Sequence, residues 1–338
     1  MTAEHATVLG SLPNAGQVIA AGARRGVELL TTVDDFVRHQ SKFDRHARLN
    51  LSFDVTDVTR EMYLDYVASQ VLDWTDAELA QLTEIVSDMS KVLQRFQFDL
   101  PSPIYLVKTT GQEEAHAAYT RNLDTIVLPA NMVASLWVPA DFGDPLHEGG
   151  SQTYLREVVL HECFHLFSKS NVARRTELYE VIGYRMTDEI ELPDVPWPDS
   201  DSSTSMRDLK ITNPDTPLID VVIELVIPGG DRGPTPVAPV LLASGPYQGG
   251  SFFGLLGWYF MEVVERDGAW TPQLDAGERP VLHVVEPGSE LLAVYEQAIG
   301  HNLTDELFHP DEVLAQNWDL VAAEPSLELL AKMADLLR

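Results

Sequence analysis

The segment His161-Glu162-Cys163-Phe164-His165 constrains this chain most, because it places two histidines four residues apart inside an apolar run. Residues four apart share one face of a helix, so both imidazoles can bind the same ion. The flanking residues predict a buried helix, and Ser151 or Thr153 can cap its start. Burying two histidines and a glutamate without a partner is costly. A metal site, with zinc as the first choice of ion, therefore explains the segment better than a helix whose histidines only satisfy hydrogen bonds.

Glu162 directly follows the first histidine, so its carboxylate lies beside any ion that the two histidines bind. A carboxylate in that place can take a proton from an attacking water, as the general base of metal-dependent hydrolysis does. Cys163 is the one cysteine of the chain, and we expect it to be a small apolar filler on the far side of the helix. No intramolecular disulfide can form, so nothing indicates an oxidising compartment.

The charge of the chain limits its partners. Its formal net charge is −29, from 52 acidic against 23 basic residues, and no basic patch stands out. This composition argues against binding to nucleic acid or to an anionic membrane surface. No apolar run reaches the ~18 residues that a membrane helix requires, and no basic stretch precedes the mildly apolar N-terminal residues. We therefore expect no membrane insertion, no signal peptide and a cytoplasmic location.

Helical patterns dominate the N-terminal part of the chain. Apolar residues recur at helical spacing in Val58–Leu72, and again in Thr75–Phe98, where Thr75 and Glu78 form a capping-box pattern. Residues 1–30, rich in Ala and Gly, are expected to be loosely attached. The pattern therefore predicts that residues 1–100 form a mostly helical region.

From Pro101 onward the pattern shortens to the period of β-strands and then alternates with helices. Strands are expected at Ile104–Lys108, as a pair within Ala117–Leu128, and at Leu218–Ile227, Val237–Ala243, Leu255–Glu265 and Val281–Val285. Besides the motif helix, helices are expected at Ala173–Ile182, at Glu290–Ile299, from Pro310 onward and at Leu327–Leu337. The turn Asp267-Gly268 predicts a hairpin between the last two strands. A Pro-rich loop at about 192–217 either covers a cleft or only connects two sheets.

A catalytic zinc usually takes three protein ligands, so a third ligand is expected outside the motif. Asn171 stands where a third histidine six residues after His165 would lie, which excludes that pattern. Glu177 and Glu180 are the near candidates, and their alternative is the solvated face of a helix. Glu312 is the distant candidate, and its alternative is an ordinary charge in the first turn of a helix. We favour Glu312.

The run from His309 to Trp318 resembles the E-x-x-A-D element of the neprilysin-like and prenyl-protein-processing zinc peptidases, which are gluzincins. Glu312 and Ala315 match that element, whereas Gln316 stands at its aspartate position. In those families the glutamate binds zinc and the aspartate orients a histidine ligand. The resemblance therefore implies that Glu312 binds zinc, and it puts an amide, Gln316, in the orienting position.

Three stretches together resemble a little-characterised bacterial family of H-E-x-x-H proteins. They are Leu106–Gly111 with Ala118–Arg121 and Ile126–Pro129, the motif helix with Leu178-Tyr179 and Ile182-Gly183, and His309–Trp318. The resemblance implies an α+β fold whose residues 101–338 form a zincin-like catalytic domain, with a small twisted sheet before the buried motif helix. The edge strand of that sheet, Thr125–Leu128 or Ala117–Thr120, would bind an extended substrate backbone, with Tyr119 and Arg121 facing the cleft.

The resulting hypothesis is a zinc metallopeptidase that acts on a peptide or protein. His161, His165 and Glu312 hold Zn²⁺, and Glu162 is the general base. The candidates for a second donor to the oxyanion, or for groups that orient the ligands, are Gln316, Asn317, His309, Tyr259, Tyr247 and His301. Two alternatives stay open: a metal-dependent hydrolase of a non-peptide amide or ester, and a zinc-binding module without turnover. The sequence indicates no partner protein.

Overall fold

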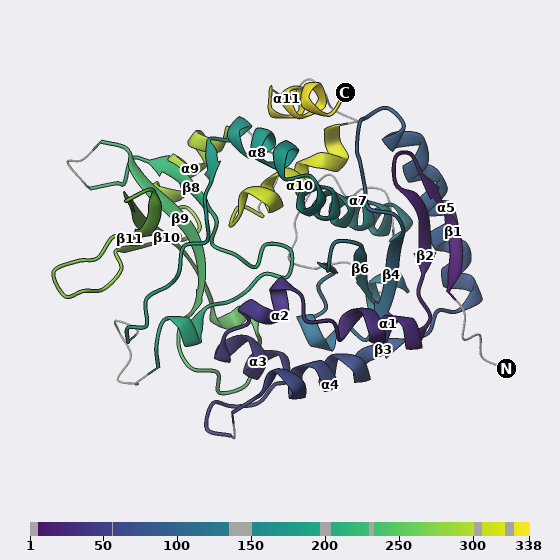
Figure 1. Ribbon diagram of the computed structural model, residues 1–338, viewed down its shortest axis with the longest axis horizontal. Coiled ribbons are helices and arrows are strands. Elements are labelled where there is room, and N and C mark those ends of the chain that lie inside the picture. The colour runs from purple at the N-terminus through teal and green to yellow at the C-terminus, as the bar shows by residue number, and fades with distance from the viewer. Residues whose placement is uncertain are drawn as a thin grey trace.

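The computed structural model describes residues 6–55, 57–134, 151–196, 204–229, 233–300, 306–321 and 328–338, with the side chains of 151–153 and 319–320 left out. Within these ranges the chain forms two six-stranded sheets with helices around them (Figure 1). The coarse prediction of a mixed α and β fold is confirmed. Among the described residues, no helix is both long and apolar enough to cross a membrane.

Strands from the N-terminus and from the middle of the chain share the first sheet. Its order is β1-β2-β4-β6-β5, with β3 also pairing β4. The strands β2, β4 and β6 are parallel, whereas β1 and β5 close the two edges in antiparallel pairs. The bounds are β1 (Thr7–Leu12), β2 (Gly16–Ala20), β3 (Val71–Leu72), β4 (Ile104–Thr109), β5 (Tyr119–Arg121) and β6 (Thr125–Pro129). Residues on both sides of position 100 form this sheet.

The expectation that residues 1–30 are loosely attached is wrong for the described part. Val18 and Ala20 are buried, and β2 pairs with β4 from Val18 opposite Ile104 to Ala20 opposite Leu106. The two N-terminal strands are short and joined by a tight turn, so neither offers a long alternating run. β1 pairs with β2, and β2 pairs with β4, a partner more than eighty positions later that local pattern cannot reveal.

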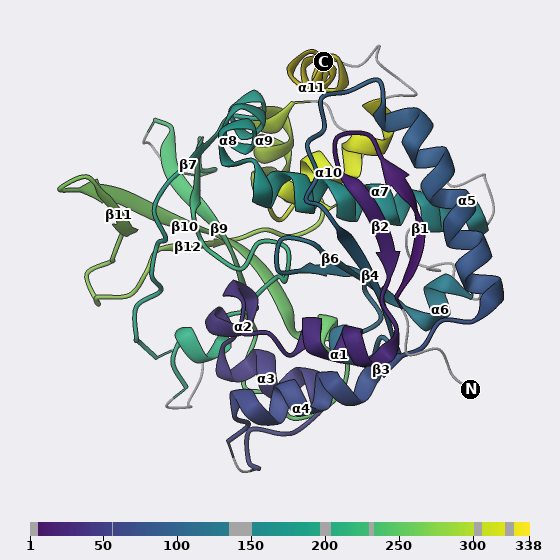
Figure 2. The same cartoon turned by 45° about the vertical axis from the view of Figure 1, so that its right-hand side comes forward.

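Helices cover both faces of the first sheet. Ile104 and Leu106 of β4 belong to the same hydrophobic cluster as residues of α5 (Asp76–Leu93) and α7 (Ser151–Ser170). Val107 belongs to a different cluster, with α1 (Ala23–Leu30) and α4 (Arg60–Gln70). Alternate residues of a strand point to opposite faces, which explains the division. Figure 2 shows α1 and α4 on the lower side of the sheet, away from α7.

Three shorter helices connect these layers: α2 (Asp35–His39), α3 (Lys42–Arg48) and α6 (Ala130–Val133). The start of α5 follows the sequence closely. Thr75 accepts a hydrogen bond from the backbone N–H of Glu78, and the Glu78 side chain accepts from the N–H of Thr75. This confirms the predicted capping box.

The second sheet is antiparallel throughout and has the order β11-β10-β9-β8-β7, with β12 also pairing β10. Its strands are β7 (Tyr184–Met186), β8 (Val221–Leu225), β9 (Thr235–Ala243), β10 (Leu256–Arg266), β11 (Ala269–Pro272) and β12 (Leu282–Val284). The turn Asp267-Gly268, with both φ angles positive, joins β10 to β11. The predicted hairpin is thus present, but its second strand is β11 and not the strand expected at Val281–Val285.

The remaining helices lie near α7 at the top of Figure 1. They are α8 (Val172–Val181), α9 (Glu290–Ile299), α10 (Pro310–Val321) and α11 (Glu328–Leu337). Residues of α7, α8, α10 and α11 share the largest hydrophobic cluster with one face of the first sheet. This cluster fixes α10 against α7, and the candidate site lies where the two helices meet.

Candidate metal centre

The motif residues lie in the middle of α7, which runs across one face of the first sheet. The imidazole of His165 is fully buried, and 15% of the His161 side chain is exposed. Glu162 is 4% exposed. Glu162 and His165 are therefore buried, and of these three side chains only that of His161 is partly exposed.

Three ligand atoms converge at this point. The Nε2 atoms of His161 and His165 are 3.0 Å apart, and Glu312 Oε2 lies 3.3 Å from each of them. Nitrogen and oxygen ligands about 2.05 Å from a tetrahedral zinc ion would be separated by about 3.3 Å. The distances therefore suit three corners of a tetrahedron around a single ion.

Glu312 reaches this point because α10 is packed firmly against α7. Phe98 stacks on Phe167 of α7 on one side and on Trp318 of α10 on the other, with ring centroids 4.3 Å and 4.4 Å apart. Pro310 begins α10, as the sequence predicts, because its fixed φ suits the first turn of a helix. The first turn of α10 thereby points its acidic residues at the histidines.

Asp311, which sequence analysis did not single out, orients His165. Its carboxylate lies 2.6 Å from His165 Nδ1 and also accepts hydrogen bonds from the hydroxyls of Ser168 and Tyr179, at 2.5 Å and 2.8 Å. A donor at Nδ1 leaves the lone pair of Nε2 for an ion. The position next to Glu312 was the available signal, but the resemblance drew attention to position 316 instead.

Gln316 and Asn317 lie one turn later on α10. Gln316 is half-buried, and the contact with a histidine that its position implied is made by Asp311 instead. Asn317 is fully buried, and its amide donates to the carbonyl of Val313 within the helix at 2.7 Å. These contacts place the orienting group at the start of the helix.

Glu177 and Glu180 lie on α8 with their side chains exposed. Glu177 forms an ion pair with Arg174 at 3.0 Å. Because Asn171 alone separates α7 from α8, the chain has no length in which to turn back toward the histidines. Of the three candidate ligands, only Glu312 joins the histidine pair.

The other candidate donors fall in different places. His309 accepts a hydrogen bond from the N–H of Asp311 at 3.1 Å, and burial lowers its pKa to about 4. Tyr259 lies on β10 against the second hydrophobic cluster, and the Tyr247 hydroxyl donates to Asn50 and to the carbonyl of Gly250. His301 lies outside the described residues. His309 is therefore the candidate nearest to the ligands along the chain.

The charges of the site depend on one another. Burial alone would lower the pKa of His161, but its hydrogen bond with Glu312 raises it to about 9. The same burial would raise the pKa of Glu312, yet the two histidines hold it well below its ordinary value. Burial and the nearby Asp215 raise the pKa of Glu162 to about 8. Without a metal, Glu312 is thus the charged carboxylate and Glu162 is the protonated one at neutral pH.

The outer edge of β5 is covered. The backbone N–H of Thr120 donates to Asp215 Oδ1 at 2.8 Å, and the ammonium of Lys169 lies 3.5 Å from the same oxygen. Tyr119 and Arg121 are buried on the other face, where Arg121 pairs with Asp34 at 2.7 Å. The expectation that these two side chains face a cleft is therefore wrong, because strand alternation turns both toward α1 and α2.

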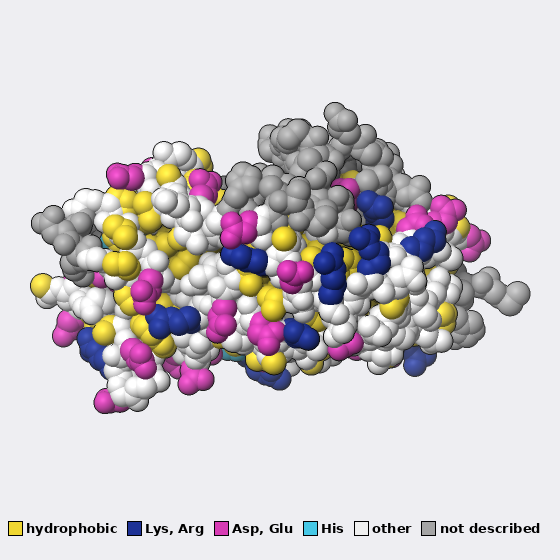
Figure 3. Space-filling model, turned by 90° about the horizontal axis from the view of Figure 1, so that it is seen from above, with side chains coloured by type: hydrophobic (Ala, Val, Ile, Leu, Met, Phe, Trp, Pro, Cys, Tyr) yellow, Lys and Arg dark blue, Asp and Glu magenta, His cyan; other side chains and the backbone are white. Residues whose placement is uncertain are grey.

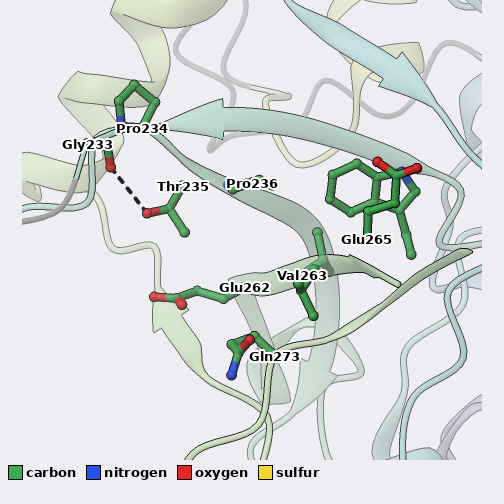
Figure 4. Close-up of a pocket in the computed structure, with 10 residues that line it drawn as sticks. Gly233, Pro234, Thr235, Pro236, Glu262, Val263, Glu265 and Gln273 are labelled. Atoms are coloured by element: carbon green, nitrogen blue, oxygen red, sulfur yellow. Dashed lines mark hydrogen bonds between the residues drawn. The ribbon is translucent and has the colours of Figure 1, made fainter. Parts of the chain in front are cut away.

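Neither of the two cavities described next is lined by His161, Glu162, His165 or Glu312. A cavity of about 320 Å³ lies on the second sheet between β9, β10 and β11, where the Thr235 hydroxyl donates to the carbonyl of Gly233 (Figure 4). A smaller cavity, of about 30 Å³, is lined by Asn213 and His309 among others.

On the face of the molecule seen from above, acidic and basic side chains are interspersed (Figure 3).

The donor set fits a zinc ion. Two imidazole nitrogens and one carboxylate oxygen form a combination typical of catalytic zinc, which leaves a fourth position open. The Oε2 atom of Glu162 is buried and has no hydrogen-bond partner among the described residues. An orphaned carboxylate oxygen beside three converging ligands is explained by a further polar group between them.

Compared with known proteins, the chain matches no family model, no curated protein and no solved structure.

Proposed function

We propose that this chain is a zinc-dependent peptidase. The observation that carries the proposal is the convergence of His161, His165 and Glu312 from two helices, with Glu162 enclosed beside them. A bound zinc ion supplies a Lewis acid, which polarises a carbonyl and makes water easier to deprotonate. The other tasks of peptide hydrolysis fall to side chains of the chain itself.

Glu162 accepts the proton of the attacking water and passes it to the leaving amine. Its buried position raises its proton affinity, which suits a group that must first accept and then donate. Asp311 holds His165 by Nδ1, so that Nε2 keeps its direction throughout. Asn213 donates to Glu312 Oε1 at 2.6 Å and leaves Oε2 to face the histidines.

The test is the zinc content of the purified protein beside its variants. We expect close to one zinc per chain in the wild type, and a sharp loss in His165→Ala and in Glu312→Ala. Glu177→Ala and Glu180→Ala are the matched controls and should keep their zinc. Zinc that persists in Glu312→Ala would remove that residue from the centre.

Glu162→Gln separates binding from catalysis. The variant should keep its zinc while hydrolysis of a peptide library falls by about 10²–10⁴-fold, because the general base is lost. Zinc binding without cleavage in the wild type would favour the non-catalytic module.

A second candidate function is the hydrolysis of a small amide or ester. The covered edge of β5 favours it, because a small substrate does not need the backbone N–H that Asp215 occupies. Both substrate classes use the same zinc chemistry, so product analysis on a mixed panel of peptides and small amides distinguishes them.

A further inference from the structure

Residues 211–217, here called the strap, cross the candidate site between fixed ends. At one end, Ile211 N–H donates to the carbonyl of Leu241 in β9, and Thr212 N–H donates to Asp44 at 3.0 Å. At the other end, the carbonyl of Pro217 accepts from Lys210 Nζ at 2.8 Å. The sheet and α3 thus hold the first end, and Lys210, which itself forms a bridge with Leu242 of β9, holds the second.

The middle of the strap contacts the site through two side chains. Asn213 bonds Glu312, and its own Oδ1 accepts from the N–H of Asp215 at 2.8 Å. Ligand atoms of Asp215, Glu162 and His165 all lie within 4.8 Å of one another. The strap therefore brings a carboxylate to the general base from the side of the sheet edge.

Asp215 also occupies the edge of β5. Its carboxylate accepts from both the N–H and the hydroxyl of Thr120, and Lys169 donates to the carbonyl of Pro214 at 3.2 Å. An extended peptide that joined this sheet would need the same N–H of Thr120. Asp215 and a substrate backbone therefore compete for one donor.

The strap does not pair with β5 as a strand. Pro214 and Pro217 have no N–H, so the segment cannot form a backbone ladder with the edge. Side chains make the contacts instead, and Asp215 reaches both Thr120 and the surroundings of Glu162. A peptide backbone is neutral and can form the ladder, so it has means of displacing the strap.

We infer that the strap is an internal occupant of the substrate position, which keeps the resting enzyme self-blocked until an extended peptide displaces it. This inference rests on the proposed peptidase function and adds a regulatory element to the same site. Asp215 is its central contact, because it reaches both the edge of β5 and the surroundings of Glu162.

The experiment compares the zinc-loaded wild type with Asp215→Ala and with Thr216→Ala, a control within the strap. Hydrogen exchange followed by mass spectrometry reports the amides of residues 117–121 and 211–217, with residues 162–168 as an internal reference. We expect the fastest exchange at both segments in Asp215→Ala, and exchange like that of the wild type in Thr216→Ala. Asp215→Asn keeps an oxygen acceptor for Thr120 and should give an intermediate rate, which guards against a folding defect in the alanine variant.

The second readout is the affinity of a zinc-directed probe, the hydroxamate of a leucyl-alanine dipeptide. We expect it to bind Asp215→Ala at least about tenfold more tightly than the wild type or Thr216→Ala. Equal affinity in all three proteins would overturn the strap, and so would failure of the probe to bind any of them while zinc is present.

The two proposals fail in different ways. A tighter probe affinity in Asp215→Ala without cleavage of any peptide would end the peptidase proposal and leave the strap standing. Absence of zinc from the wild type would end both, since the strap would then have no centre to block.

Discussion

Glu162 and Glu312 carry the same carboxyl group, but in the metal-free chain the pKa of Glu162 is raised and that of Glu312 is lowered. Glu312 faces two imidazoles, which keep it ionised, whereas Glu162 has Asp215 nearby and an oxygen without a partner among the described residues. Environment alone separates the two acids. The division leaves Glu312 as the ionised carboxylate that faces the histidines, whereas Glu162 must lose its proton before it can act as a base.

At the residue scale, the stability of the metal-free protein should fall as pH rises through this site. The pKa of Glu162 is about 8 when folded, against an ordinary value of 4.5, so the folded chain binds a proton there that the unfolded chain has lost. The free energy of unfolding therefore decreases with pH over that interval. The pKa of His161 is raised to about 9, so this group also lowers the free energy of unfolding as pH rises.

Glu162→Gln removes the contribution of Glu162. Its metal-free form should match the wild type most closely near pH 5 and exceed it in stability by pH 8, in urea unfolding with a chelator present. Glu177→Gln, at an exposed position of α8, is the control for the substitution itself. A difference between Glu162→Gln and the wild type that does not change with pH would contradict the assignment.

At the scale of elements, the first turn of α10 performs two tasks with adjacent acids. Asp311→Asn keeps an oxygen for Ser168 and Tyr179 but loses the charge that faces His165. We expect zinc affinity to fall by about 10–100-fold, as for other groups that orient a metal ligand. Gln316→Ala is the control from the same helix and should bind zinc as the wild type does. Competition with a chromogenic chelator measures both, and the reverse ranking would restore position 316 to the orienting role.

Elements with strong local signals could be predicted from the sequence, and elements that depend on distant partners could not. The capping box at Thr75 predicted the start of α5, and Pro310, which suits the first turn of a helix, predicted the start of α10. The strand β11 is four residues long and follows a two-residue turn, so its own pattern is too short to detect. The same holds for β1 and β2, since β2 pairs with the distant β4 and β1 pairs with β2.

The candidate site divides in the same way. His161, Glu162 and His165 form one local motif, and Glu312 was found through a resemblance over its own helix. Asp311 and Asp215 were missed because their roles arise from tertiary contact with α7 and β5. Apart from the position of Asp311 next to Glu312, nothing in their immediate neighbours distinguishes them from surface acids.

At the scale of the whole molecule, buried charge joins the first sheet to the segment that leads into the second. Arg48 of α3 donates to Glu114 at 2.7 Å and to Asp44 at 2.7 Å, and also to the carbonyl of Thr212 in the strap. All of these groups are buried. Arg48→Met leaves two carboxylates without their cation, and we expect it to cost about 3–5 kcal/mol.

Denaturant unfolding of the zinc-loaded protein measures this loss. The control is Arg38→Met, which breaks an exposed pair with Asp35 and should change stability by at most about 1 kcal/mol. A similarly small change in Arg48→Met would show that the buried network contributes little to the fold.

The two helices that form the centre are made at very different times during translation. The histidine pair on α7 leaves the ribosome first, and the strands β7 to β12 are all synthesised before Glu312. A partly made chain therefore carries the pair without its third ligand. On the proposed function, any activity of the centre begins only after the second sheet has been synthesised.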